Sequence, residues 1–123
     1  MSAPLPLTTI LIDLDDTLYP ASSGIFDRVR QRIYEYMRDV VRVPEPEIQE
    51  LRERLYHTYG TTLRGLMLEY GVDMATYLAY VHGFPLDGYL RQDAELRAAL
   101  ESLPQTKWVF TNASAEYGRR ILQ

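Results

Sequence analysis

The 123-residue chain is long enough for one ordinary hydrophobic core, and two full domains are not expected. Its composition, 46% hydrophobic and 24% charged, is typical of a globular protein, and a net charge of −4 without a basic stripe argues against a nucleic acid polymer as partner. Because cysteine is absent, disulfides, thiolate metal sites and a cysteine nucleophile are excluded, as in a protein of the reducing cytoplasm.

The N-terminal segment begins without a basic region, and its apolar run stops at Asp13. Such a run is too short for a secretory signal or a membrane span. We therefore expect a cytoplasmic protein with no membrane partner. The contiguous apolar residues within Thr8–Leu14 predict a strand buried on both faces, as in a parallel sheet covered by helices.

From Gly24 the spacing of apolar residues becomes helical, and four amphipathic helices are expected before residue 84. Ser22 or Ser23 is placed to cap the first of them, and Asp73 the fourth. Gly60, Gly71 and Gly83 are placed to end the second, third and fourth. The predicted buried faces are Phe26, Val29, Ile33, Tyr36, Met37 and Val40, then Ile48, Leu51, Leu55 and Tyr59, then Leu63, Leu66, Met67 and Tyr70, and finally Met74, Tyr77, Leu78 and Val81.

A fifth helix is expected to begin at Asp93 and to end before Pro104. A second apolar strand follows over Trp108–Phe110 and stops at Thr111, and Asn112 or Ser114 can cap a last helix. The order predicts an α/β protein with a partial Rossmann-like core, residues 1–20 and 93–123, and an inserted helical cap, residues 21–92.

Asp13, Asp15 and Asp16 crowd the end of the first strand, and their mutual repulsion has to be offset by a cation, hydrogen bonds or solvent. One interpretation is a strand that ends at the surface with a capping residue. The other is a catalytic site, because Asp13 and Asp15 can face one small volume at the carboxyl end of a parallel strand. The spacing does not match a calcium-binding EF-hand loop, which needs a glycine at position six and a glutamate at position twelve.

The string "ILIDLDDTLYP" closely resembles the first motif of the haloacid dehalogenase superfamily, and "KWVFTNA" is similar to its second motif. The helical segment between them looks like the mobile cap of that superfamily. "YGTTLRGL", "VHG" and "LRAALESLPQTKWVFTNA" resemble the pyrimidine 5′-nucleotidase branch of its phosphatases. The resemblance covers almost the whole chain.

The resemblance implies a Mg²⁺-dependent phosphatase that acts on small phosphomonoesters. Asp13 would be the nucleophile and form an aspartyl phosphate, and Asp15 the general acid and base. Mg²⁺ would be held by the Asp13 carboxylate and the backbone carbonyl of Asp15, and the phosphoryl group by Thr111 and the backbone N–H of Asn112. The superfamily's third-motif lysine and fourth-motif acids normally follow the second motif, and Lys107 precedes it. The chain is therefore expected to be the front part of an enzyme and to be inactive alone.

The resemblance makes nucleoside 5′-monophosphates the preferred substrate class, with a sugar phosphate or phosphoglycolate as the alternative. Tyr19, Tyr59 and Thr61 are candidates for substrate contact, although Thr61 can equally cap the following helix and tyrosines at helical spacing can be packing residues. A non-catalytic binding fragment of the same fold is the alternative outside the enzymes. The oligomeric state is not predicted.

Overall fold

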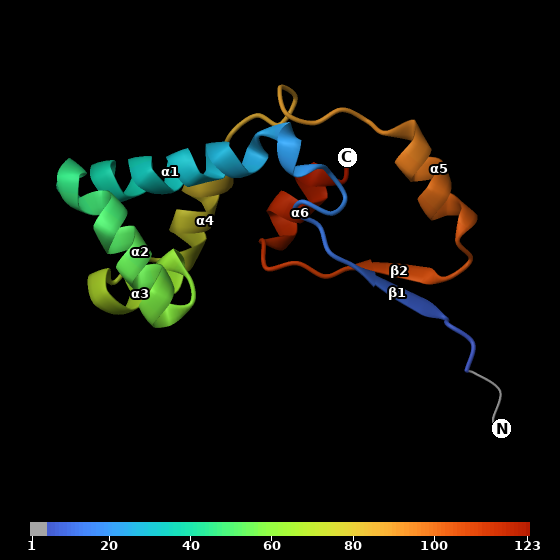
Figure 1. Cartoon of the computed structure of the whole chain (residues 1–123), viewed down its shortest axis with the longest axis horizontal. Coiled ribbons are helices and arrows are strands. Elements are labelled where there is room, and N and C mark those ends of the chain that lie inside the picture. The colour runs from blue at the N-terminus through green and yellow to red at the C-terminus, as the bar shows by residue number, and fades with distance from the viewer. Residues whose placement is uncertain (1–4) are drawn as a thin grey trace. The chain divides into compact units, whose positions relative to one another are not determined.

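The computed structural model of the chain describes residues 5–123 and shows a mixed α/β architecture (Figure 1). The expected order of strand, helical segment, helix, strand and helix is confirmed. In the described part of the chain the elements are β1 (Thr9–Ile12), η1 (Ala21–Ser23), α1 (Ile25–Asp39), η2 (Glu45–Glu47), α2 (Ile48–Tyr59), α3 (Thr62–Tyr70), α4 (Met74–His82), α5 (Ala94–Ser102), β2 (Thr106–Val109) and α6 (Ala115–Ile121), where η marks a short 3₁₀ turn.

The two strands pair in parallel, with Thr9 opposite Thr106 and Ile12 opposite Val109. Hydrogen bonds continue the pairing at both ends, from the Thr106 N–H to the Thr8 carbonyl at 3.0 Å and from the Phe110 N–H to the Ile12 carbonyl at 2.8 Å. Figure 1 shows the strands side by side and pointing the same way. Their carboxyl ends therefore meet at one edge of the sheet.

The chain divides into two compact units. The sheet unit consists of the residues up to Gly24 together with Leu86–Gln123, and the helical unit is Ile25–Pro85. The sequence segments 5–20 and 93–123, predicted as core, lie in the sheet unit, and so do residues 21–24 and 86–92, which the sequence assigned to the cap. Residues 1–4 of the predicted core segment lie outside the described residues.

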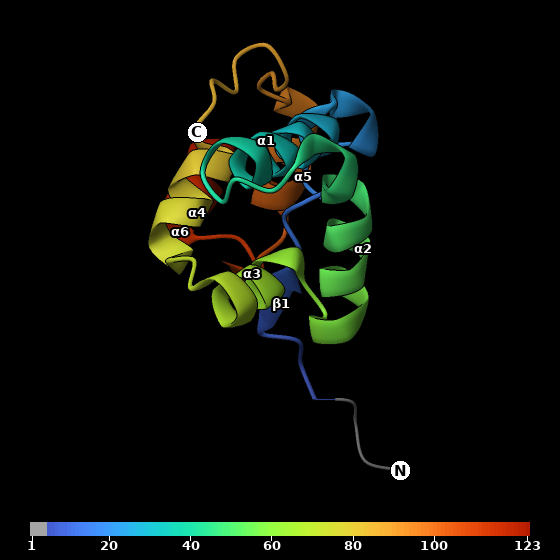
Figure 2. The same ribbon diagram turned by 90° about the vertical axis from the view of Figure 1, so that its left-hand side faces the viewer.

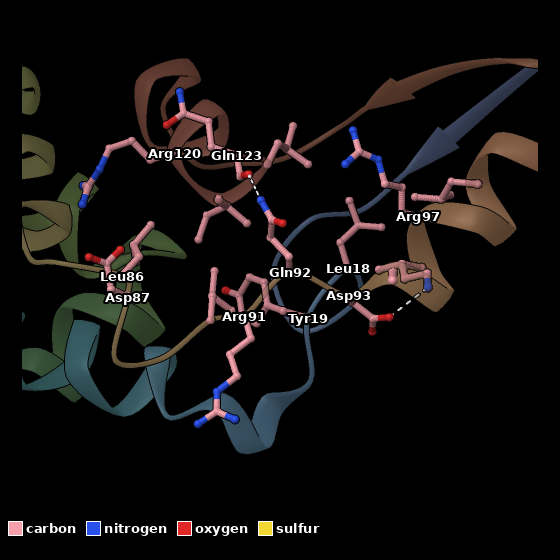
Figure 3. Close-up of a pocket in the computed structure, with 16 residues that line it drawn as sticks. Leu18, Tyr19, Leu86, Asp87, Arg91, Gln92, Asp93, Arg97, Arg120 and Gln123 are labelled. Carbon is pink, nitrogen blue, oxygen red and sulfur yellow. Dashed lines mark hydrogen bonds between the residues drawn. The ribbon is translucent and has the colours of Figure 1, made fainter.

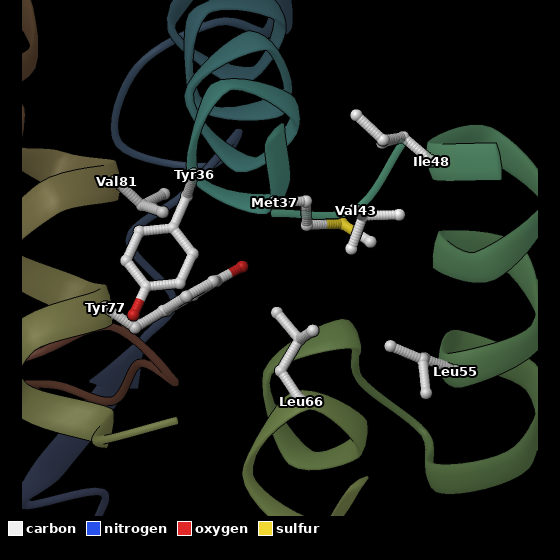
Figure 4. Close-up of a cluster of buried hydrophobic side chains, with 8 residues drawn as sticks. All are labelled: Tyr36, Met37, Val43, Ile48, Leu55, Leu66, Tyr77 and Val81. Carbon is white, nitrogen blue, oxygen red and sulfur yellow. The ribbon is translucent and has the colours of Figure 1, made fainter. Parts of the chain in front are cut away.

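The helical unit consists of α1 to α4 (Figure 2), and its core lies among them. Tyr36 and Tyr77 pack edge to face with ring centroids 5.0 Å apart. Arg32 of α1 lies 4.1 Å from the Tyr80 ring centroid and donates to the Tyr80 carbonyl at 2.7 Å, which joins α1 to α4. The buried cluster drawn in Figure 4 consists of Tyr36, Met37, Val43, Ile48, Leu55, Leu66, Tyr77 and Val81.

The helix ends follow the capping expectations closely. The side chain of Asp73 accepts from the Thr76 N–H at 2.8 Å, and that of Asp93 from the Leu96 N–H at 2.9 Å. At the other ends, Gly60 and Gly71 cap α2 and α3 with φ angles of 86° and 67°, in the left-handed region that favours glycine. Local sequence chemistry thus sets the lengths of these helices.

Several positions predicted as buried are exposed instead. In the helical unit these are Phe26, Val40, Met67, Tyr70 and Met74, which are 40% to 51% exposed. Val40 lies beyond the end of α1. Ile25 and Leu66 are buried, and the residues that follow them, Phe26 and Met67, point away from the core because adjacent helical residues lie on different faces. In the sheet the prediction of burial on both faces is wrong for the described residues, because Leu11 is 68% and Trp108 62% exposed. β1 and β2 pair through their edges, so neither strand covers a face of the other.

Candidate functional site

Asp13, Thr111 and Asn112 line one depression of about 370 Å³, together with Leu11 and Phe110. The parallel register explains why they meet, since Asp13 follows Ile12 directly and Thr111 follows two residues after Val109, its partner. Polar residues at the carboxyl ends of neighbouring parallel strands occupy the usual ligand position of open α/β sheets. Four of the five lining positions thus come from residues at or just beyond the strand ends.

The side chains in this depression already make local hydrogen bonds. Asp13 is exposed, and its Oδ1 accepts from the Leu14 N–H at 2.8 Å. The hydroxyl oxygen of half-buried Thr111 accepts from the Ala113 N–H at 3.1 Å, an arrangement that leaves the hydroxyl proton able to donate. The depression therefore offers one solvent-facing carboxylate and one oriented hydroxyl donor.

A tight turn follows β1 and directs the other two aspartates. The Leu14 carbonyl accepts from the Thr17 N–H at 3.2 Å and from the Leu18 N–H at 3.0 Å. Asp16 has a φ of 56°, in the left-handed region that aspartate tolerates better than most residues. Asp16 is exposed and Asp15 half-buried, and of the three aspartates only Asp13 lines the depression.

Asp15 is hydrogen-bonded to buried Tyr19, and buried Tyr117 of α6 lies close to both. The Tyr19 hydroxyl donates to Asp15 Oδ1 at 2.5 Å. Burial and then the Asp15 carboxylate raise the pKa of Tyr19 well above its ordinary value, and burial raises the pKa of Tyr117 to about 12. Both tyrosines remain neutral hydrogen-bonding groups at neutral pH.

A larger cavity of about 580 Å³ lies elsewhere in the sheet unit, beside α5 and the end of α6 (Figure 3). Tyr19 lines it, but Asp13, Asp15, Thr111 and Asn112 do not. Its polar side chains include Asp93, which caps α5, and Gln92, which donates to the Gln123 carbonyl at 3.4 Å. We place the candidate site in the smaller depression because that is where the strand ends converge.

Tyr59 and Thr61 lie in the helical unit. The Tyr59 hydroxyl donates to Glu69 Oε1 at 2.9 Å, and the Thr61 hydroxyl oxygen accepts from the Arg64 N–H at 3.1 Å as the N-cap of α3. Thr61 thus has the capping role that the sequence left open beside substrate contact. Contact of Tyr19, Tyr59 and Thr61 with a substrate stays a prediction.

The described residues contain no cluster of three or more histidine, aspartate or glutamate side chains able to hold a metal ion. The donors that the sequence resemblance names are one carboxylate, on Asp13, and one backbone carbonyl, on Asp15. Oxygen donors of this kind suit Mg²⁺, which keeps several waters and takes few protein ligands. Binding of Mg²⁺ by these two donors stays a prediction.

Sequence reasoning missed Tyr117 of α6, which lies close to Tyr19 and Asp15. No local pattern marks Tyr117 as a partner of Tyr19, because their contact depends on how α6 packs against the turn after β1. The signal available in the sequence is the apolar Leu14 between Asp13 and Asp15, which in the structure is fully buried and needs a packed element to cover it.

Comparison with protein-family models gives no match. Phosphate metabolism protein 8 of Saccharomyces cerevisiae is 27% identical to the chain over 120 residues, which cover 90% of the chain. The aligned region is 37% of the yeast protein, so the chain spans well under half of the length of this curated relative. Within residues 5–123, none of the helices combines the length and apolar character that crossing a bilayer requires.

Proposed function

We propose that the chain carries the nucleophile and phosphate-binding part of a phosphatase of the haloacid dehalogenase type. The observation that carries the proposal is the convergence of Asp13, Thr111 and Asn112 in one depression at the carboxyl ends of paired parallel strands. The similarity to a yeast protein named for phosphate metabolism supports it. The motif resemblance of "ILIDLDDTLYP" and "KWVFTNA" supplies the residue roles.

In the proposed reaction an oxygen of the Asp13 carboxylate attacks phosphorus, and the bond from phosphorus to the ester oxygen breaks. Protonated Asp15 gives its proton to the departing oxygen, so that an alcohol leaves and Asp13 carries the phosphoryl group. Asp15, now a carboxylate, takes a proton from water, whose oxygen attacks phosphorus while the bond from phosphorus to the Asp13 oxygen breaks. Inorganic phosphate leaves and both aspartates return to their starting states.

The Thr111 hydroxyl and the Asn112 backbone N–H would bind phosphoryl oxygens in both steps. These two hydrogen-bond donors would contribute most in the transition state, because negative charge accumulates on the phosphoryl oxygens there. A bound Mg²⁺, held by the Asp13 carboxylate and the Asp15 backbone carbonyl, would neutralise part of the charge shared by nucleophile and phosphate. The fixed donors orient the phosphoryl group in line with the attacking oxygen.

The finer proposal is that the substrates are nucleoside 5′-monophosphates, with pyrimidine bases preferred over purine bases. It depends on the resemblance of "YGTTLRGL" to the pyrimidine 5′-nucleotidase branch. A sugar phosphate or phosphoglycolate is the alternative substrate. We further propose a protein of the cytoplasm whose partner is this small phosphomonoester.

The test is phosphate release by the complete gene product with Mg²⁺, comparing UMP, CMP, AMP, a sugar phosphate and phosphoglycolate at limiting enzyme. Asp13→Asn should remove activity by several orders of magnitude, because an amide is a poor nucleophile and a poor metal ligand. Asp16→Asn is the matched control, since asparagine also tolerates its φ of 56° and this exposed carboxylate has no role in the reaction.

Loss of activity in the Asp13 variant alone, with unchanged circular dichroism, supports the nucleophile assignment. Activity of Asp13→Asn within about tenfold of wild type would overturn it. A higher kcat/KM for a sugar phosphate or phosphoglycolate than for every nucleotide would overturn the substrate proposal and leave the phosphatase chemistry standing.

A further inference from the structure

Tyr19 lies four residues after Asp15, at the end of the turn that follows β1. Its side chain is only 6% exposed, and its hydroxyl donates to Asp15 Oδ1. Asp15 itself is half-buried and lies in a turn whose next residue, Asp16, is exposed. A carboxylate in such a turn would otherwise be free to change rotamer, so the bond from a buried phenol restricts it.

The support for Tyr19 comes from α6. Tyr117, 3% exposed, lies close to Tyr19 and contributes to the raised pKa of the Tyr19 hydroxyl. Leu14, fully buried on the other side of Asp15 in the sequence, has its Cδ2 3.7 Å from the position that a Cβ on Gly118 would occupy. Leu14 and Tyr19, both buried, thus anchor the backbone on either side of Asp15, and the Tyr19 hydroxyl holds its carboxylate.

We propose that Tyr19 is a positioning residue for Asp15: its hydroxyl holds one carboxylate oxygen and leaves the other directed for proton transfer to the leaving group. The inference rests on the proposed function, in which Asp15 is the general acid and base. General acids act only within hydrogen-bond reach of the reacting oxygen. A misplacement of about 1 Å can cost about a hundredfold in rate.

Tyr19 could act by positioning Asp15 or only by packing. Comparing substrates whose leaving groups do and do not need a proton distinguishes these two roles. An alkoxide, as in a nucleoside monophosphate, needs a proton in order to leave, whereas p-nitrophenolate leaves readily without one. Tyr19→Phe keeps the buried ring and removes only the hydroxyl. It should lower kcat for the best alkyl phosphate substrate by about tenfold to a hundredfold with little change in KM, and should change p-nitrophenyl phosphate hydrolysis by less than about threefold.

Tyr117→Phe keeps the buried ring beside Tyr19 and leaves the bond from Tyr19 to Asp15 in place, and a smaller loss with the same selectivity is expected. Tyr34→Phe is the matched control, because the Tyr34 hydroxyl is hydrogen-bonded to the Glu45 carboxylate in the helical unit. A readout without substrate is the set of Hα–Hβ couplings of Asp15 by NMR. These should change from values for one rotamer to averaged values in Tyr19→Phe, and should not change in Tyr34→Phe.

Asp15→Asn separates failure of this inference from failure of the proposed function. If Asp15→Asn shows the leaving-group selectivity and Tyr19→Phe lowers both substrates equally or neither, the positioning role is overturned and the phosphatase proposal stands. Unaveraged Asp15 couplings in Tyr19→Phe would overturn it too, even if that variant is too unstable to assay. If Asp15→Asn retains full activity on alkyl phosphates, the proposed role of Asp15 fails, and the inference fails with it.

Discussion

The helical unit and the sheet unit differ in where they place their apolar side chains. In the helical unit one cluster of large apolar residues packs together, and Leu55, Leu66 and Ile48 in it are fully buried. In the sheet unit Leu11, Trp108 and Phe110 are 68%, 62% and 72% exposed. The first unit is held by a packed core, and the second by a short parallel ladder and the few residues beneath it.

The packed core and the candidate catalytic residues therefore lie in different units. The candidate catalytic residues Asp13, Asp15 and Thr111 all lie in the unit with the less complete core, at the ends of strands and in a turn. Loop and strand-end positions leave polar groups accessible to a ligand, and a closed helical core does not. In the sheet unit a single buried side chain can still orient a functional group, as buried Tyr19 does by donating to the Asp15 carboxylate.

The sharpest test of the comparison is a pair of truncations. Leu55→Ala should lower the free energy of unfolding by about 2–5 kcal/mol, because it leaves a cavity in a tightly packed cluster. Leu11→Ala should change it by no more than about 0.5 kcal/mol, since its side chain is already in solvent. Urea denaturation followed by far-ultraviolet circular dichroism measures both.

Trp108 provides a second probe, because it is the single tryptophan of the chain and lies in β2. If the two units unfold independently, Leu55→Ala shifts the circular dichroism transition and leaves the Trp108 fluorescence transition in place. Coincident shifts of both signals would show one cooperative unit and contradict the comparison. A Leu11→Ala variant as unstable as Leu55→Ala would contradict the assignment of the core.

Two helical glycines give a smaller contrast. A Cβ on Gly65 would lie 2.7 Å from Leu55 Cβ and 2.9 Å from Tyr59 Cδ2, so Gly65→Ala should cost about 1–3 kcal/mol through overpacking. A Cβ on Gly118 would meet only Leu14 Cδ2, at 3.7 Å, within ordinary contact. Gly118→Ala should therefore be neutral or stabilise α6 by about 0.5–1 kcal/mol through helix propensity.

Thermal unfolding of both alanine variants beside wild type measures this contrast. A stable Gly65→Ala protein would mean that α2 and α3 can separate at little cost. A destabilised Gly118→Ala protein would mean that α6 packs against the turn after β1 more tightly than the 3.7 Å contact indicates.

The sequence was most informative where structure depends on neighbours along the chain. Asp73, Asp93 and Ser114 cap helices as expected, and Gly60 and Gly71 end them, because capping is decided within a few residues. The α/β class and the parallel strands also follow from the order of apolar runs. These features are determined by residues close together in the sequence, so the sequence alone predicts them.

The sequence was least informative where a side chain depends on distant packing. The helical period correctly selects Tyr36, Met37 and Leu55, but not the exposed Phe26 and Met67, because the rim of an apolar stripe is decided by what packs there. The same limit hides the proximity of Tyr19 and Tyr117, which come from opposite ends of the chain. Strand ends identify candidate ligands such as Asp13 and Thr111, and only the register shows that they line one depression.

The smallest expected effect concerns two ion pairs, one in each unit. Arg54 donates to both oxygens of Glu69, at 2.7 and 2.6 Å, and Tyr59 donates to Glu69 Oε1 at 2.9 Å. The Arg54 guanidinium and then the Tyr59 hydroxyl lower the pKa of Glu69 from 4.5 to about 2. In the sheet unit, Arg97 and Glu101 pair through one contact at 3.2 Å, with side chains 75% and 70% exposed.

A depressed carboxyl pKa stabilises the fold at every pH above its unfolded value, and the stabilisation is lost as the pH falls through the folded value. Glu69→Gln should therefore lower the melting temperature at pH 7, and its difference from wild type should shrink between pH 4.5 and about 2. Glu101→Gln is the control, for which no measurable change is expected because exposed single pairs contribute little. Melting curves of the three proteins across this pH range test the prediction. A Glu69→Gln difference that stays constant with pH would show that the variant acts through packing and not through the charge of Glu69.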